Sequence, residues 1–91
     1  MPDKVHCAHI LVKSESEAKA VSERLKKGEK FGRVARAVSR CPSAKHGGDL
    51  GTFTRGKMVK EFENAAFALR KGEVSGVVKT QFGCHVIKRL E

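Results

Sequence analysis

The chain has 91 residues, of which 40% are hydrophobic and 32% are charged, and 19 Lys and Arg against 10 Asp and Glu give a formal net charge of +9. This composition is too apolar for a disordered tail, and no run approaches the roughly 18–20 apolar residues that a membrane-spanning helix needs. We therefore expect one small soluble domain over residues 1–91, with a radius of gyration of about 12 Å.

The amino terminus and the cysteines bear on location. The amino-terminal segment that begins Met1–Lys4 shows no apolar stretch followed by a small-residue cleavage site, so we expect no secretory signal in the sequence as given. Cys7, Cys41 and Cys84 cannot all pair within the chain and form no CxxC motif. We expect a monomeric cytoplasmic protein without a disulfide scaffold.

The first half of the chain predicts one strand and two helices. Val5–Val12 is an apolar, β-branched run without a helical stripe, which is typical of a central strand buried on both faces. Ser14–Glu17 has the spacing of a capping box and predicts a helix that ends at Gly28. Apolar residues at helical spacing over 31–38 predict a second helix, which the Cys41–Pro42 pair terminates.

The second half predicts a loop, three strands and one helix. The glycine-rich segment 41–51 is expected to be a loop, and 50–54 a short strand. A helical stripe over 62–69 ends before Gly72, and strands follow at 74–79 and 84–90. The order β-α-α-β-α-β-β indicates an α+β domain whose terminal strands pair in the middle of the sheet. His9 and His85 face each other if the face of the first strand that carries Cys7, His9 and Leu11 coincides with the face of the last strand that carries His85 and Ile87, which residue counting leaves open.

Several residues have reactive side chains: His9, Cys41, His85, and the hydroxyls of Ser43 and Thr80. A Cys–His hydrolase needs such groups within hydrogen-bond reach. The alternative is that each histidine is an ordinary core residue with its ring nitrogens satisfied.

Two kinds of ligand site receive little support. Histidines and cysteines occur near both ends of the chain, but their spacings match no structural-zinc pattern, so we expect no metal and no cofactor. Residues 43–51 lack the P-loop spacing and precede a strand rather than a helix.

The positive charge is concentrated in residues 31–60, which hold seven Lys and Arg against Asp49 alone. A solvated helix face explains this pattern, and a nucleic-acid surface is the alternative. The chain has no Trp or Tyr on which bases would stack, which makes nucleic acid the weaker reading.

Ordered motifs along nearly the whole chain resemble the parvulin family of peptidyl-prolyl cis/trans isomerases in its minimal single-domain form. The segments that carry the resemblance are Ala8–Lys13, Phe31–Gly32, Ser39–Ser43, Gly48–Gly51, Arg55–Val59, Ala65–Leu69, Lys71–Val78 and Thr80–Ile87. The resemblance implies a four-stranded antiparallel sheet surrounded by helices. It also implies catalysis of rotation about X-Pro bonds in proline-containing peptides and in unfolded or partly folded proteins.

The resemblance also implies the site residues. In the catalytic centre it places His9, Cys41, Thr80 and His85. For substrate binding it indicates Ser43, Leu50, Phe53, Met58, Phe62 and Phe82. Cys84 stands where small relatives often carry an aromatic residue, and we assign it no catalytic role. A non-catalytic chaperone domain on the same fold is the remaining alternative.

The connection after the first strand bears on substrate choice. Relatives selective for phosphoserine or phosphothreonine before proline carry a basic cluster there, whereas Lys13–Glu17 has one base and two acids. We therefore expect no phosphate requirement and a preference for an uncharged residue before proline.

Overall fold

The protein is represented by a computed structural model that describes residues 4–91. Its elements, in chain order, are β1 (Lys4–Val12), α1 (Glu15–Lys26), α2 (Phe31–Val38), the 3-10 helix η1 (Pro42–His46), β2 (Asp49–Thr54), α3 (Lys60–Ala68), β3 (Val78–Thr80) and β4 (Gly83–Arg89). The Cα radius of gyration is 11.8 Å, as the length predicts.

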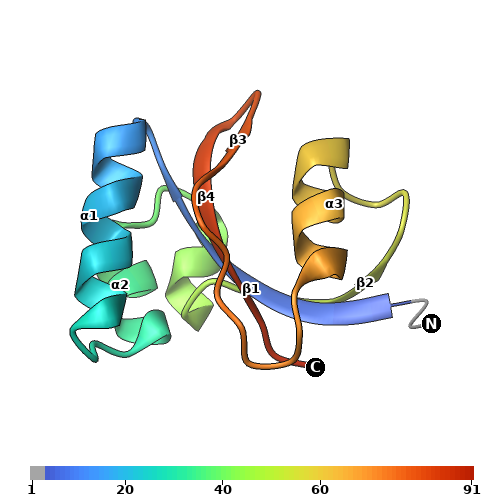
Figure 1. Cartoon of the computed structure of the whole chain (residues 1–91), viewed down its shortest axis with the longest axis horizontal. Coiled ribbons are helices and arrows are strands. Elements are labelled where there is room, and N and C mark those ends of the chain that lie inside the picture. The colour runs from blue at the N-terminus through green and yellow to red at the C-terminus, as the bar shows by residue number, and fades with distance from the viewer. Residues whose placement is uncertain (1–3) are drawn as a thin grey trace.

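The four strands form one antiparallel sheet in the order β2-β1-β4-β3. The terminal strands β1 and β4 pair at its centre, with His9 opposite Ile87 and Leu11 opposite His85. Helices α1 and α2 lie on one side of the sheet and α3 lies on the other (Figure 1). The predicted fold class and the central pairing are therefore confirmed.

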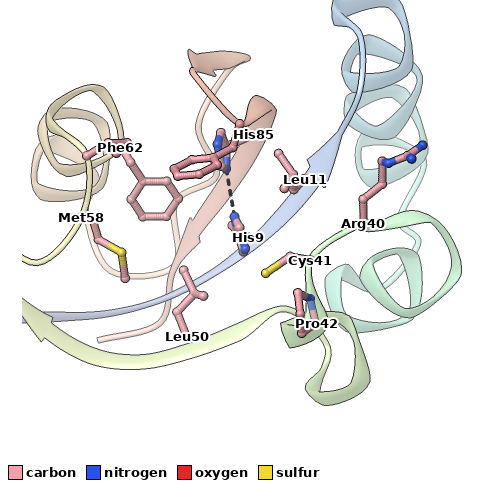
Figure 2. Close-up of a pocket in the computed structure, with 11 residues that line it drawn as sticks. His9, Leu11, Arg40, Cys41, Pro42, Leu50, Met58, Phe62 and His85 are labelled. Carbon is pink, nitrogen blue, oxygen red and sulfur yellow. Dashed lines mark hydrogen bonds between the residues drawn. The ribbon is translucent and has the colours of Figure 1, made fainter.

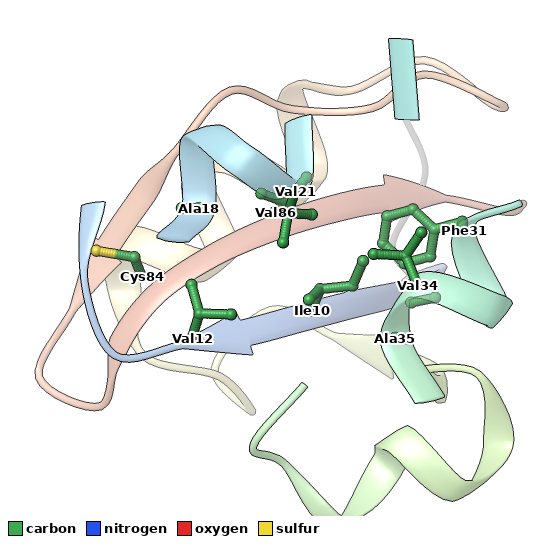
Figure 3. Packing of buried hydrophobic residues seen from close by; sticks show 10 residues of the cluster. Ile10, Val12, Ala18, Val21, Phe31, Val34, Ala35, Cys84 and Val86 are labelled. Carbon is green, nitrogen blue, oxygen red and sulfur yellow. The ribbon is translucent and has the colours of Figure 1, made fainter. Parts of the chain in front are cut away.

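The alternation of side chains along β1 divides the core into two clusters. Ala8, Ile10 and Val12 pack with residues of α1 and α2 on one face, together with Val86 of β4 (Figure 3). On the other face, Val5, Cys7 and Ile87 pack with residues of α3 and Phe53 of β2. β1 is thus covered on both faces, as its continuous apolar run predicts.

Local sequence signals explain the helix boundaries. The Ser14 side chain accepts a hydrogen bond from the backbone N–H of Glu17 and caps α1. α2 ends at Val38, and its amphipathic pattern buries Phe31, Val34 and Ala35 against the sheet.

Among the described residues, no helix has the length and hydropathy needed to cross a bilayer.

Two predicted elements differ from the structure. The strand expected over 74–79 is only Val78–Thr80, although Val74 forms an isolated bridge to Lys88. Regular strand pairing is interrupted between Val74 and Val78. There the Ser75 hydroxyl accepts a hydrogen bond from the Ile87 N–H, and Gly76 follows directly. The segment predicted as a loop over 41–51 contains the 3-10 helix, with Pro42 in its first turn.

Candidate active site

A pocket of about 370 Å³ opens between the sheet and α3, on the face that carries His9 and His85 (Figure 2). Strand β1, the η1 segment, the start of β2, the α3 entry and the β3–β4 hairpin all contribute to it. Its lining residues are His9, Leu11, Arg40, Cys41, Pro42, Leu50, Met58, Val59, Phe62, Phe82 and His85.

The two histidines form the floor of this pocket. They come from adjacent central strands at diagonal positions of the register, and their Nδ1 atoms lie 2.9 Å apart. The rings stack with centroids 5.1 Å apart, and Phe62 meets both edge-on at 5.5 and 5.3 Å. His9 is 5% and His85 4% exposed, so packing fixes both rings.

Burial keeps both imidazoles neutral. Desolvation and, as the smaller cause, the neighbouring His85 together lower the pKa of His9 from 6.5 to about 4. Desolvation also lowers the pKa of His85. Two neutral rings facing each other through Nδ1 share one proton, so one ring donates and the other accepts.

The Thr80 hydroxyl sets the direction of this hydrogen-bond chain. Its oxygen accepts the Phe82 N–H at 3.1 Å and lies 2.7 Å from Nε2 of His85. If the hydroxyl donates to His85 Nε2, His85 Nδ1–H donates to His9, and only the His9 Nε2–H lacks a partner. The opposite direction leaves both the Thr80 hydrogen and His9 Nε2 unpaired. We therefore assign the first arrangement, because it leaves fewer buried groups unsatisfied.

The walls of the pocket are apolar. Leu50 at the start of β2 and Met58 before α3 are half-buried, whereas Phe62 on the first turn of α3 is 3% exposed. Phe82, at the β3–β4 turn, is 63% exposed and stands at the rim. These side chains form an apolar slot above a hydrogen-bonded floor, which suits a ligand with one compact apolar ring.

A glycine positions the β2 side of the pocket. Gly48 has φ +86°, and its carbonyl accepts the N–H of His9 at 2.9 Å. A Cβ built at this position would lie 2.2 Å from the His9 carbonyl oxygen, so no side chain fits there. The chain can therefore pass directly against β1 before Leu50 enters the pocket.

Cys41 is the N-terminal cap of η1 and is half-buried, with its sulfur turned toward the histidine pair (Figure 2). Within residues 4–91, no hydrogen bond joins the thiol to either imidazole. His9 directs Nδ1 to His85, and His85 directs Nε2 to Thr80, so the Cys–His contact that a hydrolase requires is not formed.

The structure brings together most, but not all, of the predicted site residues. His9, His85, Cys41, Leu50, Met58, Phe62 and Phe82 line the pocket. Thr80 lies behind His85 rather than in the lining. Phe53 and Ser43 also lie outside it. Phe53 packs behind Phe62 with ring centroids 6.1 Å apart, and the buried Ser43 hydroxyl has no hydrogen-bond partner among residues 4–91.

Four lining residues were missed by the sequence reasoning: Leu11, Arg40, Pro42 and Val59. Leu11 was detectable, because it shares a strand face with His9. Arg40 follows α2, where its backbone N–H donates to Leu11, and its side chain points away from the histidine pair (Figure 2). No periodic pattern covers Arg40, Pro42 or Val59, which lie in irregular segments.

The other potential metal ligands have separate roles. His6 Nε2 lies 2.6 Å from a carboxylate oxygen of Asp49, and burial raises the pKa of the Cys7 thiol to about 11. Across residues 4–91, no group of three or more His, Cys, Asp or Glu side chains gathers in metal-binding geometry.

The sequence matches the family described as "Rotamase: PPIC-type PPIASE domain" over residues 9–91. It is 56% identical over 86 residues to the foldase protein PrsA of Geobacillus kaustophilus, covering 93% of this chain but 31% of that protein. The chain thus spans about a third of the length of this curated relative.

Two solved structures of similar size and one of a longer chain share this fold. The solution structure of NmPin, the parvulin of Nitrosopumilus maritimus, matches with a TM-score of 0.89 and 53% identity, covering 100% of this chain and 99% of that one. Pin from the archaeon Cenarcheaum symbiosum matches with a TM-score of 0.87 and 62% identity, covering 100% and 95%. PrsA from Bacillus subtilis has a TM-score of 0.95 and 49% identity, with 98% of this chain and 35% of that one covered.

Proposed function

The chain belongs to the PPIC-type peptidyl-prolyl isomerase family, the parvulins, and from this premise we propose that it accelerates cis/trans rotation about X-Pro bonds in unfolded and partly folded proteins. The observation that carries the proposal is the apolar slot formed by Leu50, Met58 and Phe62 over the buried pair of His9 and His85.

The required rate enhancement is within what non-covalent binding in this pocket can supply. An X-Pro bond isomerises over tens to hundreds of seconds, because its partial double bond imposes a barrier of roughly 20 kcal/mol. Bringing this step to milliseconds requires roughly four to five powers of ten, or about 5–7 kcal/mol of preferential binding to the transition state. No covalent bond has to break.

The apolar slot supplies positioning and desolvation. Leu50, Met58 and Phe62 hold the proline ring while the carbonyl of the preceding residue rotates. The twisted amide has lost its resonance and much of its charge separation, so a water-poor surface favours it over the planar ground state. An apolar wall therefore contributes more to the transition state than to the substrate.

The polar side chains of the site hold the two histidine rings at the base of the pocket in fixed positions. The chain from Thr80 through His85 to His9 fixes both rings and leaves the His9 Nε2–H as an unpartnered donor beside the pocket. Cys41 borders the same space as a polar surface and not as a nucleophile, since rotation needs no covalent intermediate. Cys41→Asp is expected to retain activity if this role is correct.

We further propose that the enzyme does not require a phosphate before proline. In the connection after β1, Glu15 lies in the first turn of α1 and pairs with Lys79 of β3, with Nζ and the carboxylate 3.2 Å apart. Lys13 alone therefore adds a free cation to this connection, whereas a dianionic phosphate is best held by several cations.

The test is an isomerisation assay on peptides that differ only before proline, with Leu, Glu or phosphoserine at that position. We expect the wild type to accelerate the Leu peptide, and Met58→Ala to lose most of this acceleration. Leu25→Ala is the matched control, because it truncates a half-buried apolar side chain of α1, outside the pocket.

The outcomes separate the claims. No acceleration by a folded protein would contradict the isomerase proposal and favour a binding domain on this fold. Equal losses in Met58→Ala and Leu25→Ala would contradict the assignment of the slot. Turnover of the phosphoserine peptide many times faster than the Leu peptide would contradict phosphate independence.

We also propose a cytoplasmic, monomeric protein. The three cysteines are free, which fits a reducing compartment. Within residues 4–91, only Val74 and Phe82 are large apolar side chains with broad exposure, which leaves little surface for a permanent dimer. Cell fractionation and sedimentation velocity test the two statements separately.

A further inference from the structure

A second concave surface lies on the face of the sheet opposite to the isomerase pocket. It has a volume of about 520 Å³ and is bordered by the α1–α2 connection, the end of η1 and the last residues of β4. Ala8 and Phe31 of its floor are buried core residues, and Leu25 and Leu90 pack against the same cluster. We call this surface the rear groove.

The rear groove carries an uncompensated positive charge. Lys30, Arg36 and Lys88 line it, and none of them forms an ion pair with another described residue. Lys88 is the most telling of the three, because it is half-buried on the central strand β4. Lys88 lines the rear groove and no described carboxylate pairs with its ammonium, which is therefore open to an anionic group of a ligand.

The two acids of the rear groove do not serve as those counter-ions. Glu29 is held by the guanidinium of Arg24 through two hydrogen bonds of 2.9 Å. Asp49 accepts hydrogen bonds from the Gly51 N–H at 2.7 Å and from His6 at 2.6 Å. The charge of Glu29 is therefore balanced by Arg24, whereas Asp49 keeps its negative charge, and the three cations of the rear groove outnumber it.

The rear groove also has an apolar edge. Val74, 40% exposed, borders it and is bridged to Lys88 across the sheet margin. Phe82, the other broadly exposed large apolar side chain among residues 4–91, belongs to the isomerase pocket. An exposed valine beside unpaired cations and above an aliphatic floor matches a ligand that alternates acidic and apolar groups.

We propose that the rear groove binds an acidic peptide segment of a partner or client protein, with aliphatic side chains on the floor and carboxylates on Lys30, Arg36 and Lys88. A nucleic acid fits less well. The floor offers aliphatic side chains and a buried Phe31, which is 8% exposed, instead of open aromatic faces on which bases stack.

The proposal is tested with the whole chain, labelled with ¹⁵N, and a ten-residue acetylated and amidated peptide that alternates Asp or Glu with Leu and contains no proline. Binding is expected to shift the amide signals of Gly32, Gly47 and Val74, and to leave those of Met58 and Phe82 in place. Peptides with Lys for the acids, or Gly for the leucines, are expected to bind at least tenfold more weakly.

Paired variants separate the groove from the general charge of the protein. Arg36→Gln with Lys88→Gln removes two groove cations, and is expected to weaken binding at least tenfold while isomerisation is unchanged. Arg33→Gln with Lys19→Gln removes the same charge from exposed helix positions outside the groove, and is expected to change binding less than twofold.

Three results would overturn the proposal. Equal weakening in both double variants would mean that only net charge attracts the peptide. Shifts confined to Met58 and Phe82 would place the peptide in the isomerase pocket. Tighter binding of a single-stranded oligonucleotide than of the acidic peptide, with the same sensitivity to the groove variant, would assign the groove to nucleic acid.

Discussion

Acid is expected to destabilise the protein through its buried histidine pair. In the native state, desolvation holds the pKa of His9 at about 4, against 6.5 for an ordinary histidine. The unfolded chain therefore takes up a proton as pH falls below 6.5, while the native state does not until about 4. Because the unfolded state binds more protons in this window, stability is full above pH 6.5 and is lost as pH falls toward 4.

The pKa difference sets the magnitude. At 1.36 kcal/mol for each pKa unit, His9 alone contributes at most about 3 kcal/mol, and about 2 kcal/mol of this is already lost at pH 5. The lowered pKa of His85 acts in the same direction. Against a total of about 5–15 kcal/mol for a small domain, this is a large fraction.

Urea unfolding at pH 7.5, 6 and 5 measures this loss, and His9→Gln isolates its source. The variant starts from a lower stability, but its loss between pH 7.5 and 5 is expected to be about 2 kcal/mol smaller than that of the wild type. Leu25→Ala, which also lowers stability but removes no titrating group, is the matched control and should keep the wild-type slope. Parallel slopes for the wild type and His9→Gln would refute the reasoning, as would an NMR titration of the His9 ring near pH 6.5.

Three further outcomes follow from single contacts. Gly48→Ala should destabilise the protein at least about 2 kcal/mol more than Gly28→Ala, measured by urea unfolding, because both have positive φ but only Gly48 faces the His9 carbonyl. Thr80→Val should cost about 1–2 kcal/mol and reduce isomerisation, whereas Thr80→Ser should restore both; equal effects would contradict the hydrogen-bond role. In the native protein, a thiol reagent should modify only Cys41, because the other two cysteines are buried. In urea it should modify all three cysteines. Rapid labelling of a second thiol in the native protein would contradict this packing.

Strand and helix patterns were enough to predict the framework. The apolar run of β1 predicted a central strand, and the alternation of side chains predicted that His9 lies on the other face from Ala8 and Ile10. The capping box at Ser14 fixed the start of α1, because its side chain leaves few alternatives for the first turn. These features depend on residues close in sequence, and they are therefore readable without coordinates.

The details of the pocket depend on irregular segments, and there prediction was weaker. Phe53 packs in the core behind Phe62 and does not line the pocket, because it pairs with Val5, which lies on β1 four residues before His9. Pro42 lines the pocket because it begins a 3-10 helix, and no hydrophobic periodicity in the sequence predicts this helix. The rear groove was equally hidden, because it joins three elements that are distant in sequence.

The two faces of the sheet separate two kinds of chemistry. Rotation of an X-Pro bond gains from a surface of low polarity, and the isomerase pocket is lined by neutral imidazoles and apolar side chains, with the Arg40 guanidinium directed away from the histidine pair. The excess of cations at Arg36 and Lys88 lies on the opposite face. Adjacent residues of β1 also lie on different faces: Ala8 lines the rear groove, and His9 lines the isomerase pocket. The sheet thus keeps Arg36 and Lys88 away from the reacting bond.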